Sequence, residues 1–187
     1  SRLLGDEHRW TGLVLSREAS LLLDRGELDA ASEKIDDAAS VFKATGGPDH
    51  PDFTNVHFVR GRIAMERGEL ATAVAELRSG QVLAQADSGG SAIDQIEWPL
   101  ARALALQGDA QGRVLAESVV GRLSEKLGRD DWRVRLKLAS LTLPPFATAA
   151  DAEDLEDARA LIDELARSFP PEAPRIKSLA AQLAAAR

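Results

Sequence analysis

Residues of the types that carry out enzymatic chemistry are few in this sequence of 187 residues. It contains no cysteine, so thiol catalysis and disulfide bonds are excluded. Its serines lie outside any Gly-x-Ser-x-Gly motif, and no glycine-rich loop is followed by Lys-Ser or Lys-Thr, the pattern that holds a nucleotide phosphate. Aspartate and glutamate are plentiful, but they are predicted to lie on exposed helix faces. We therefore find no catalytic constellation and no cofactor site, and we predict that the chain is not an enzyme.

One short stretch has residues that bind metal ions in other proteins. The sequence "DHPD", residues 49–52, places His50 between two aspartates, and His57 follows nearby. Metal ligands must converge on one point, however, and His57 is predicted on the next helix, where its side chain points elsewhere. We interpret the stretch as a loop in which Pro51 starts a helix and Asp52 or Thr54 caps it, and we predict no metal site.

The composition indicates a helical protein that binds neither nucleic acid nor a membrane. Hydrophobic residues make up 44% and aromatic residues 4%, and the predominance of Ala and Leu favours helices over strands. The formal net charge of -7 disfavours nucleic acid and anionic lipid, which attract positive charge. No apolar run approaches the length of a membrane span, and the N-terminus lacks a signal-peptide core. A cytoplasmic location is the default expectation, and the absence of an initiator Met suggests a piece of a longer protein.

The helices that would position a binding site repeat along the chain. The phrase "DRGELDAA", residues 24–31, returns as "ERGELATA", residues 66–73, so that Gly26 and Gly68 lie 42 residues apart. A third turn, at Gly108, follows after 40 residues. Apolar residues around these turns have the spacing of one helical face, and glycine allows the left-handed conformation that ends a helix. The pattern predicts helix pairs over residues 10–46, 52–88, 92–127 and 130–169.

Small residues recur at fixed distances from the turn glycines. One lies seven positions before each of the three glycines, and one lies five positions after the first two: Ala19, Gly61, Ala101, Ala31 and Ala73. Small side chains at these positions would let the paired helices approach closely. The third repeat departs from the pattern because Arg113 occupies the position after its glycine, so we expect its second helix to be shifted or loosened.

Three further features concern the later part of the chain. Pro99 predicts that its helix starts late, near Glu97, with a kinked helix as the alternative. The fourth repeat has no turn glycine, and residues 143–154 separate its helices. The helix that follows has an acidic start and an apolar face formed by Leu155, Ala158, Ile162, Leu165 and Phe169. Residues 173–187 are predicted to form a capping helix whose apolar face is Ile176, Leu179 and Leu183.

A small residue, a turn glycine and a second small residue at these offsets resemble the tetratricopeptide repeat (TPR). The 42-residue period, with "GPDHPD" in the connecting loop, is similar to the kinesin-light-chain-type variant of that family. The resemblance covers about residues 5–127, although the usual aromatic residues are mostly missing and His57 stands at a Trp-like position. It implies an all-α superhelix, a solenoid of about four helix pairs plus a C-terminal capping helix, forming one domain over residues 1–187.

The resemblance also implies a function and a binding surface. TPR domains are scaffolds or sensors, in bacteria often within larger signalling proteins, including C-terminal extensions of Ser/Thr protein kinases. The first helix of each repeat lines a concave groove. Counting from the small residues places Leu13, Ser16, Ser20 and Leu23 of the first repeat in that groove. The peptide-binding residues predicted from the later repeats are Asn55, Phe58, Arg62, Met65, Gln95, Trp98, Arg102 and Arg133.

Two pairs within this set recur 40 residues apart. Phe58 and Trp98 are one pair, and Arg62 and Arg102 are the other. Aromatic residues anchor interfaces and Arg binds carboxylates in a bidentate way, so the expected partner is an extended peptide of acidic character. The alternative is that the aromatic side chains pack between repeats and the arginines pair with Glu66 or other nearby carboxylates.

Two other functions are compatible with the sequence. The groove would close around a small ligand if the chain were the sensing domain of a transcriptional regulator or kinase. A pocket of a few hundred cubic ångströms would favour this function, whereas an open groove would favour a protein partner. Self-association through the capping helix or the N-terminal end is the other possibility, and the oligomeric state does not follow from the sequence.

Overall fold

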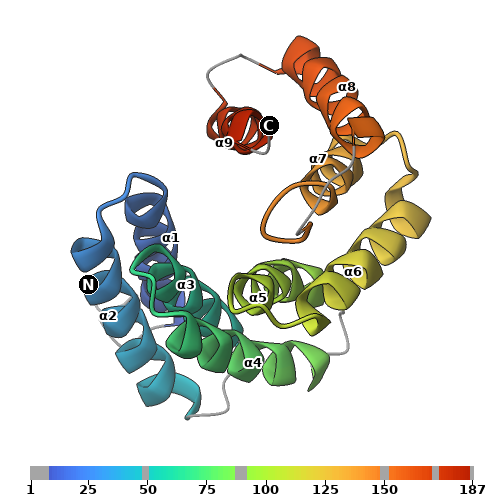
Figure 1. Cartoon of the computed structure of the whole chain (residues 1–187). Coiled ribbons are helices and arrows are strands. Elements are labelled where there is room, and N and C mark those ends of the chain that lie inside the picture. The colour runs from blue at the N-terminus through green and yellow to red at the C-terminus, as the bar shows by residue number, and fades with distance from the viewer. Residues whose placement is uncertain (1–8, 48–50, 87–91, 148–151, 170–172, 186–187) are drawn as a thin grey trace. The chain divides into compact units, whose positions relative to one another are not determined.

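A computed structural model describes residues 9–47, 51–86, 92–147, 152–169 and 173–185 (Figure 1). These residues form helices and no strand, so the all-α prediction is confirmed. The helices are α1 (Arg9–Asp24), α2 (Leu28–Gly46), α3 (Phe53–Glu66), α4 (Leu70–Ala86), α5 (Ile93–Leu106), α6 (Gln111–Leu127), α7 (Trp132–Leu141), α8 (Ala152–Ser168) and α9 (Pro174–Ala185). The chain divides into an N-terminal unit, residues 1–103, and a C-terminal unit, residues 104–187.

The N-terminal unit contains two helix pairs at the predicted places. Helix α1 packs against α2, α3 packs against α4, and α3 also contacts both helices of the preceding pair. The start of α5 is linked to α4 by a side-chain hydrogen bond, which Gln81 donates to Glu97 over 2.8 Å. The unit thus consists of two packed helix pairs and the first part of α5, which a side-chain hydrogen bond links to α4.

The turn glycines adopt the conformation that their positions predict. Gly68 has φ of +77°, in the left-handed region. The N–H of Gly68 donates to the carbonyl of Met65 over 3.0 Å, and that of Glu69 donates to Ala64 over 2.8 Å. These two bonds form a Schellman motif, which satisfies carbonyls at the helix end. Equivalent bonds occur at the turns at Gly26 and Gly108, so three turns of the repeat share one local structure.

Close helix packing depends on the small residues between the turns. Ala19, Ala31 and Ala73 are fully buried. Gly61 is buried too, and a Cβ atom placed on it would lie 2.5 Å from Cγ of Leu77 on α4. No side chain larger than hydrogen therefore fits there without movement of the paired helix.

Helix α5 begins earlier than the sequence predicts. It starts at Ile93 and continues through Pro99, so the prediction of a start near Glu97 is wrong. The proline ring supplies no N–H to the carbonyl of Gln95, which costs the helix a hydrogen bond. Burial of Ile96 and Leu100 on either side of Pro99 offsets this cost, because tertiary packing outweighs local propensity.

The second helix of the third repeat is shifted by one residue. Gly112, and not residue 113, is buried at the start of α6, and Arg113 is exposed. The Arg113 guanidinium donates to Glu117 over 2.8 Å and to the carbonyl of Phe146 over 3.3 Å. The shift thus places Gly112 in the packed position and leaves Arg113 at the surface. The sequence predicts a shifted or loosened helix here because an arginine occupies the expected small position.

The C-terminal helices share a second apolar core. Helix α7 packs on α8, and α8 packs on α9. Ala158, Ile162 and Leu165 of α8 are buried with the apolar face of α9, and Leu155 and Phe169 pack against them. The α9 residues in this core are Ile176, Leu179 and Leu183. The apolar faces predicted for residues 155–169 and for the last helix are therefore confirmed.

Some sequence features lie outside the described residues. These are His8, Asp49, His50, the Gly-rich stretch 87–91 and Asp151 at the acidic start of α8. Among the residues that are described, no group of three or more histidine, aspartate or glutamate side chains is placed to hold a metal ion. None of the described helices is both long enough and apolar enough to cross a bilayer.

Candidate functional site

The strongest candidate site is a recess between α3 and α5 in the N-terminal unit. Its volume is about 280 Å³. It contains three of the predicted peptide-binding residues, Asn55 and Phe58 from α3 and Gln95 from α5. The complete lining is Arg9, Pro51, Asp52, Thr54, Asn55, Phe58, Ala92, Gln95 and Ile96. Residues that are 40 positions apart in the sequence thus meet in one concave surface.

The lining of this recess combines an apolar base with two side-chain amides. Ile96 is buried, and Phe58 is half-buried and packs against the core of the first two helix pairs. No side chain in the described part of the chain hydrogen-bonds to the amide of Asn55 or Gln95. Each amide offers both donors and an acceptor. This arrangement suits the N–H and C=O groups of an extended peptide, with an apolar side chain of that peptide on Phe58.

An ion pair closes one side of the recess. The Arg9 guanidinium donates to both carboxylate oxygens of Asp52, with Nε–Oδ2 at 2.7 Å and Nη2–Oδ1 at 3.0 Å. This contact joins the start of α1 to the start of α3 and raises the pKa of Arg9 above its usual value. The Asp52 side chain makes no capping hydrogen bond to α3, so its predicted role as a cap is wrong. Its carboxylate instead accepts hydrogen bonds from the Arg9 guanidinium, which comes from a different helix, α1.

Arg62 lies next to the recess, but its charge is partly compensated. Its Nη2 donates to Oδ1 of Asp24 over 3.0 Å, and its guanidinium carbon lies 5.6 Å from the centre of the Phe58 ring. The aromatic–arginine pair predicted for this helix is therefore formed. The carboxylate partner is Asp24 on the neighbouring helix α1, so the alternative that Arg62 pairs with a nearby carboxylate is confirmed, with Asp24 in place of Glu66. Asp24 is well exposed, so an exchange with a ligand carboxylate would cost little.

The other predicted residues lie away from the recess. Met65 and Trp98 are half-buried, and Arg102 is exposed on α5. Arg133 lies on α7 in the C-terminal unit, where it donates to Asp131 through Nε over 2.9 Å and Nη2 over 2.8 Å. This contact lowers the pKa of Asp131 to about 2. Arg133 is thus held by its own helix cap.

Two of the first-repeat residues predicted to face a groove are buried. Ser16 and Leu23 belong to the buried face of α1, so their prediction as groove residues is wrong. They lie three residues before and four residues after Ala19, which is the spacing of one helical face. Since Ala19 is the close-contact residue, its two neighbours on that face are buried with it.

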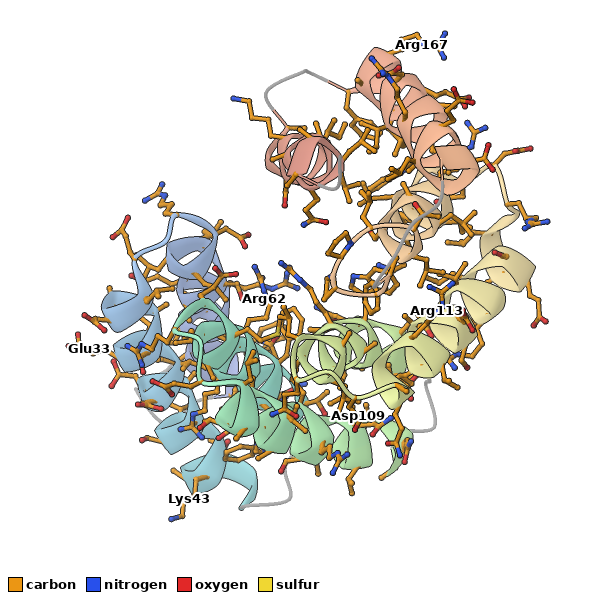
Figure 2. The ribbon with its side chains drawn as sticks, viewed as in Figure 1. Glu33, Lys43, Arg62, Asp109, Arg113 and Arg167 are labelled. Carbon is orange, nitrogen blue, oxygen red and sulfur yellow. The ribbon has the colours of Figure 1, made fainter. Side chains whose placement is uncertain are left out.

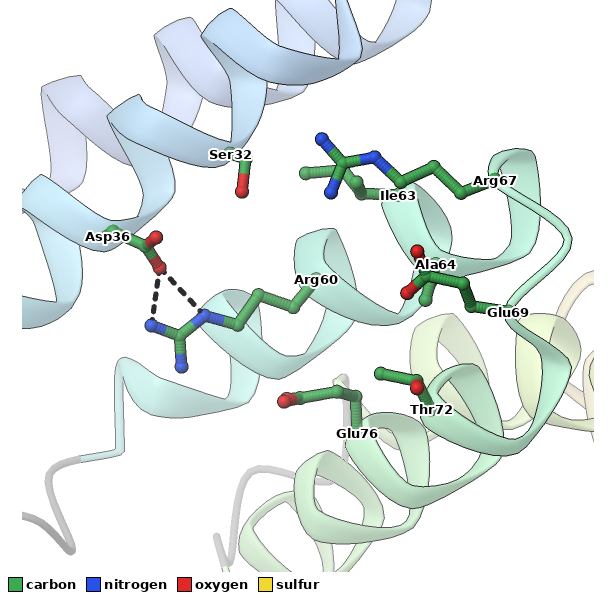
Figure 3. A pocket seen from close by; sticks show the side chains of 9 residues that line it. All are labelled: Ser32, Asp36, Arg60, Ile63, Ala64, Arg67, Glu69, Thr72 and Glu76. Carbon is green, nitrogen blue, oxygen red and sulfur yellow. Dashed lines mark hydrogen bonds and ion pairs between the residues drawn. The ribbon is translucent and has the colours of Figure 1, made fainter.

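A second recess between α2, α3 and α4 is polar and smaller, with a volume of about 180 Å³ (Figure 3). Arg60 points toward Asp36 and donates to its Oδ1 through Nε over 3.1 Å and Nη2 over 2.6 Å. Glu76, also in the lining, is bound to Nδ1 of His57 over 2.7 Å. Sequence reasoning missed this recess because its residues come from three helices and from the turn between α3 and α4: Ser32, Asp36, Arg60, Ile63, Ala64, Arg67, Glu69, Thr72 and Glu76. These pairs hold the helices together, so we do not assign ligand binding to it.

Comparison with known proteins adds no family to this description. No protein-family model matches the chain, and no curated protein matches it. The candidate site therefore depends on the geometry of the recess and on the residues that line it.

Proposed function

We propose that the chain is a TPR-like, non-catalytic interaction domain that binds an extended peptide along the face formed by α1, α3 and α5. The observation that supports this function is the recess of about 280 Å³ in which Asn55, Phe58 and Gln95 meet. Such a domain serves as a scaffold within a larger bacterial signalling protein. The recess would hold one side chain of the peptide, and the two amides would bind its backbone.

The volume of the recess does not separate a small ligand from a peptide. At about 280 Å³, it lies at the lower end of the roughly 300–1,000 Å³ that is typical of small-molecule sites, and it also suits one side chain of a peptide. The two side-chain amides in its lining favour the peptide, because they can bind the N–H and C=O groups of a peptide backbone. A small ligand of the sensing alternative would occupy the same recess.

Two arginines, one next to the recess on α3 and one farther along α5, support an acidic peptide. Arg102 is exposed and lies seven residues after Gln95, on the same face of α5. Arg62, labelled in Figure 2, is bound to Asp24 in an exposed pair, and such pairs contribute only about 0–1 kcal/mol. A peptide carboxylate would bind Arg102 directly and would compete with Asp24 for Arg62.

The test is a binding measurement with a library of acidic peptides and their charge-neutral counterparts, by fluorescence anisotropy. We expect Asn55→Ala, Gln95→Ala and the double variant Arg62→Ala/Arg102→Ala each to weaken binding of the best peptide at least about tenfold. Each variant removes one or two hydrogen bonds to a charged or polar group of the peptide, and a loss of that size is the expected cost. The matched control is Arg78→Ala/Arg129→Ala, which removes the same charge at exposed positions outside the recess. Equal binding by the wild type, the recess variants and the control would disprove the proposed function.

A further inference from the structure

Helix α5 contains a backbone carbonyl that lacks its ordinary hydrogen-bond donor. Each carbonyl of an α-helix accepts from the N–H four residues further along the chain. The residue four positions after Gln95 is Pro99, which has no N–H, although α5 runs through it from Ile93 to Leu106. Among the residues that the structure describes, no group outside α5 donates to the carbonyl of Gln95. A ligand can therefore use this acceptor.

The carbonyl lies on the side of α5 that borders the recess between α3 and α5. Gln95 belongs to the lining of that recess. A helical carbonyl points along the helix toward the residue four positions on, and residues four apart share one face. Because Gln95 is exposed and Pro99 is buried, the carbonyl lies between a residue that is open to a ligand and one that is packed in the protein.

The equivalent residue of α3 has no such carbonyl. Asn55 lies 40 residues before Gln95 and lines the same recess from α3. The residue four positions after Asn55 is Val59 within α3, and its N–H is the ordinary helical donor to the carbonyl of Asn55. Asn55 thus offers a ligand only its side-chain amide, whereas Gln95 offers a side-chain amide and a backbone acceptor.

We propose that the carbonyl of Gln95 accepts a hydrogen bond from one backbone N–H of a bound peptide, and that Pro99 is a positioning residue that leaves this acceptor open. The inference rests on the peptide-binding function proposed above and specifies which group of the peptide binds α5. Neighbouring residues of an extended chain direct their N–H groups to opposite edges. One peptide residue therefore donates to Gln95, and the next donates to the side-chain oxygen of Asn55.

The test removes each backbone N–H of the peptide in turn by an amide-to-ester substitution. The probe is the tightest-binding peptide of the acidic library, and fluorescence anisotropy gives its dissociation constant. For the wild type, we expect esters at two consecutive residues to weaken binding by about threefold to tenfold, the loss of one hydrogen bond each. In Pro99→Ala the new N–H of residue 99 binds the carbonyl of Gln95, so one of these two esters should no longer weaken binding.

Three further variants complete the experiment. Pro99→Val also restores the N–H, and it introduces the residue type that α3 has at the equivalent buried position, Val59, so its ester profile should match that of Pro99→Ala. Asn55→Ala should become insensitive to the other ester. The matched control is Pro174→Ala, because Pro174 is the first residue of α9, where a helix leaves the N–H unpaired in any case. Its ester profile should equal that of the wild type.

The results separate this inference from the proposed function. One ester profile shared by the wild type and both Pro99 variants, with binding still weakened by Asn55→Ala, would overturn the inference alone. A wild type without two consecutive sensitive esters would overturn it as well. Peptide binding that neither Asn55→Ala nor Gln95→Ala weakens would overturn the proposed function, and this inference with it.

Discussion

Replacement of Gly61 by alanine tests whether close helix contact holds the N-terminal unit together. Gly61 lies in the middle of α3 and faces α4. An added Cβ would lie 2.5 Å from Cγ and 2.9 Å from Cδ2 of Leu77, far inside the normal contact distance between carbon atoms. Leu77 is fully buried, and Cγ is close to its backbone. The leucine therefore cannot move aside without shifting α4.

Two opposing effects decide the magnitude. An extra methyl group in a well-packed core costs about 1–3 kcal/mol. Alanine in place of glycine inside a helix gains about 0.5–1 kcal/mol through propensity. Because the clash involves a fully buried side chain, we expect the packing cost to prevail. Gly61→Ala should lower the free energy of unfolding by about 1–2 kcal/mol.

The matched control is Gly121→Ala in the middle of α6. Gly121 is exposed, and no atom lies within 4 Å of the position of an added Cβ. Only the propensity gain remains, so this variant should be more stable than the wild type by about 0.5–1 kcal/mol. The same chemical change is thus expected to have opposite effects at the two sites.

Urea unfolding followed by circular dichroism at 222 nm measures both variants. If the two units unfold in separate transitions, Gly61→Ala should move the transition of the N-terminal unit and Gly121→Ala that of the C-terminal unit. The double variant Gly61→Ala/Leu77→Ala should cost less than the sum of the single variants by more than about 0.5 kcal/mol, because the added methyl occupies the vacated space. Additive costs, or a Gly61→Ala chain as stable as the wild type, would refute the packing argument.

Three further predictions concern single positions. Ser16 is 1% exposed and its hydroxyl has no partner among the described residues, so Ser16→Ala should raise the free energy of unfolding by about 1 kcal/mol in urea titrations. Gly68→Ala should lower the same quantity by about 1 kcal/mol, although the site has open space, because φ is +77° and alanine disfavours that region. The pKa of Asp131, about 2 because of hydrogen bonds from Arg133, lies below the ordinary value. Its stabilising contribution is therefore complete above pH about 4 and is lost as the pH falls through about 2. A carboxyl NMR titration should show this midpoint, and Arg133→Ala should move it toward the ordinary value.

Much of the local structure follows from the sequence. The helix pairs, the left-handed turn glycines and the buried small residues all depend on spacings within about ten residues of the chain, and these spacings act through local backbone geometry and helical periodicity. Arg113 at the expected small position likewise indicated that α6 is shifted or loosened, but the choice between the two and the size of the shift came from the structure. The sequence placed Asn55, Phe58 and Gln95 on one surface, and the structure has all three in the lining of one recess. This follows because adjacent repeats place equivalent residues next to one another.

The errors and omissions arise where partners lie on different helices. The start of α5 at Ile93, the Arg9–Asp52 pair that replaces a helix cap, and the Asp24 partner of Arg62 are decided by contacts between helices. Long charged side chains can reach several carboxylates, and only the positions of the helices select one of them. The exposure of Val14 and Leu21 on α1, whose counterparts Val56 and Ile63 on α3 are buried, is likewise a property of the fold. Sequence periodicity specifies which face of a helix is apolar, but whether another helix covers that face depends on the tertiary structure.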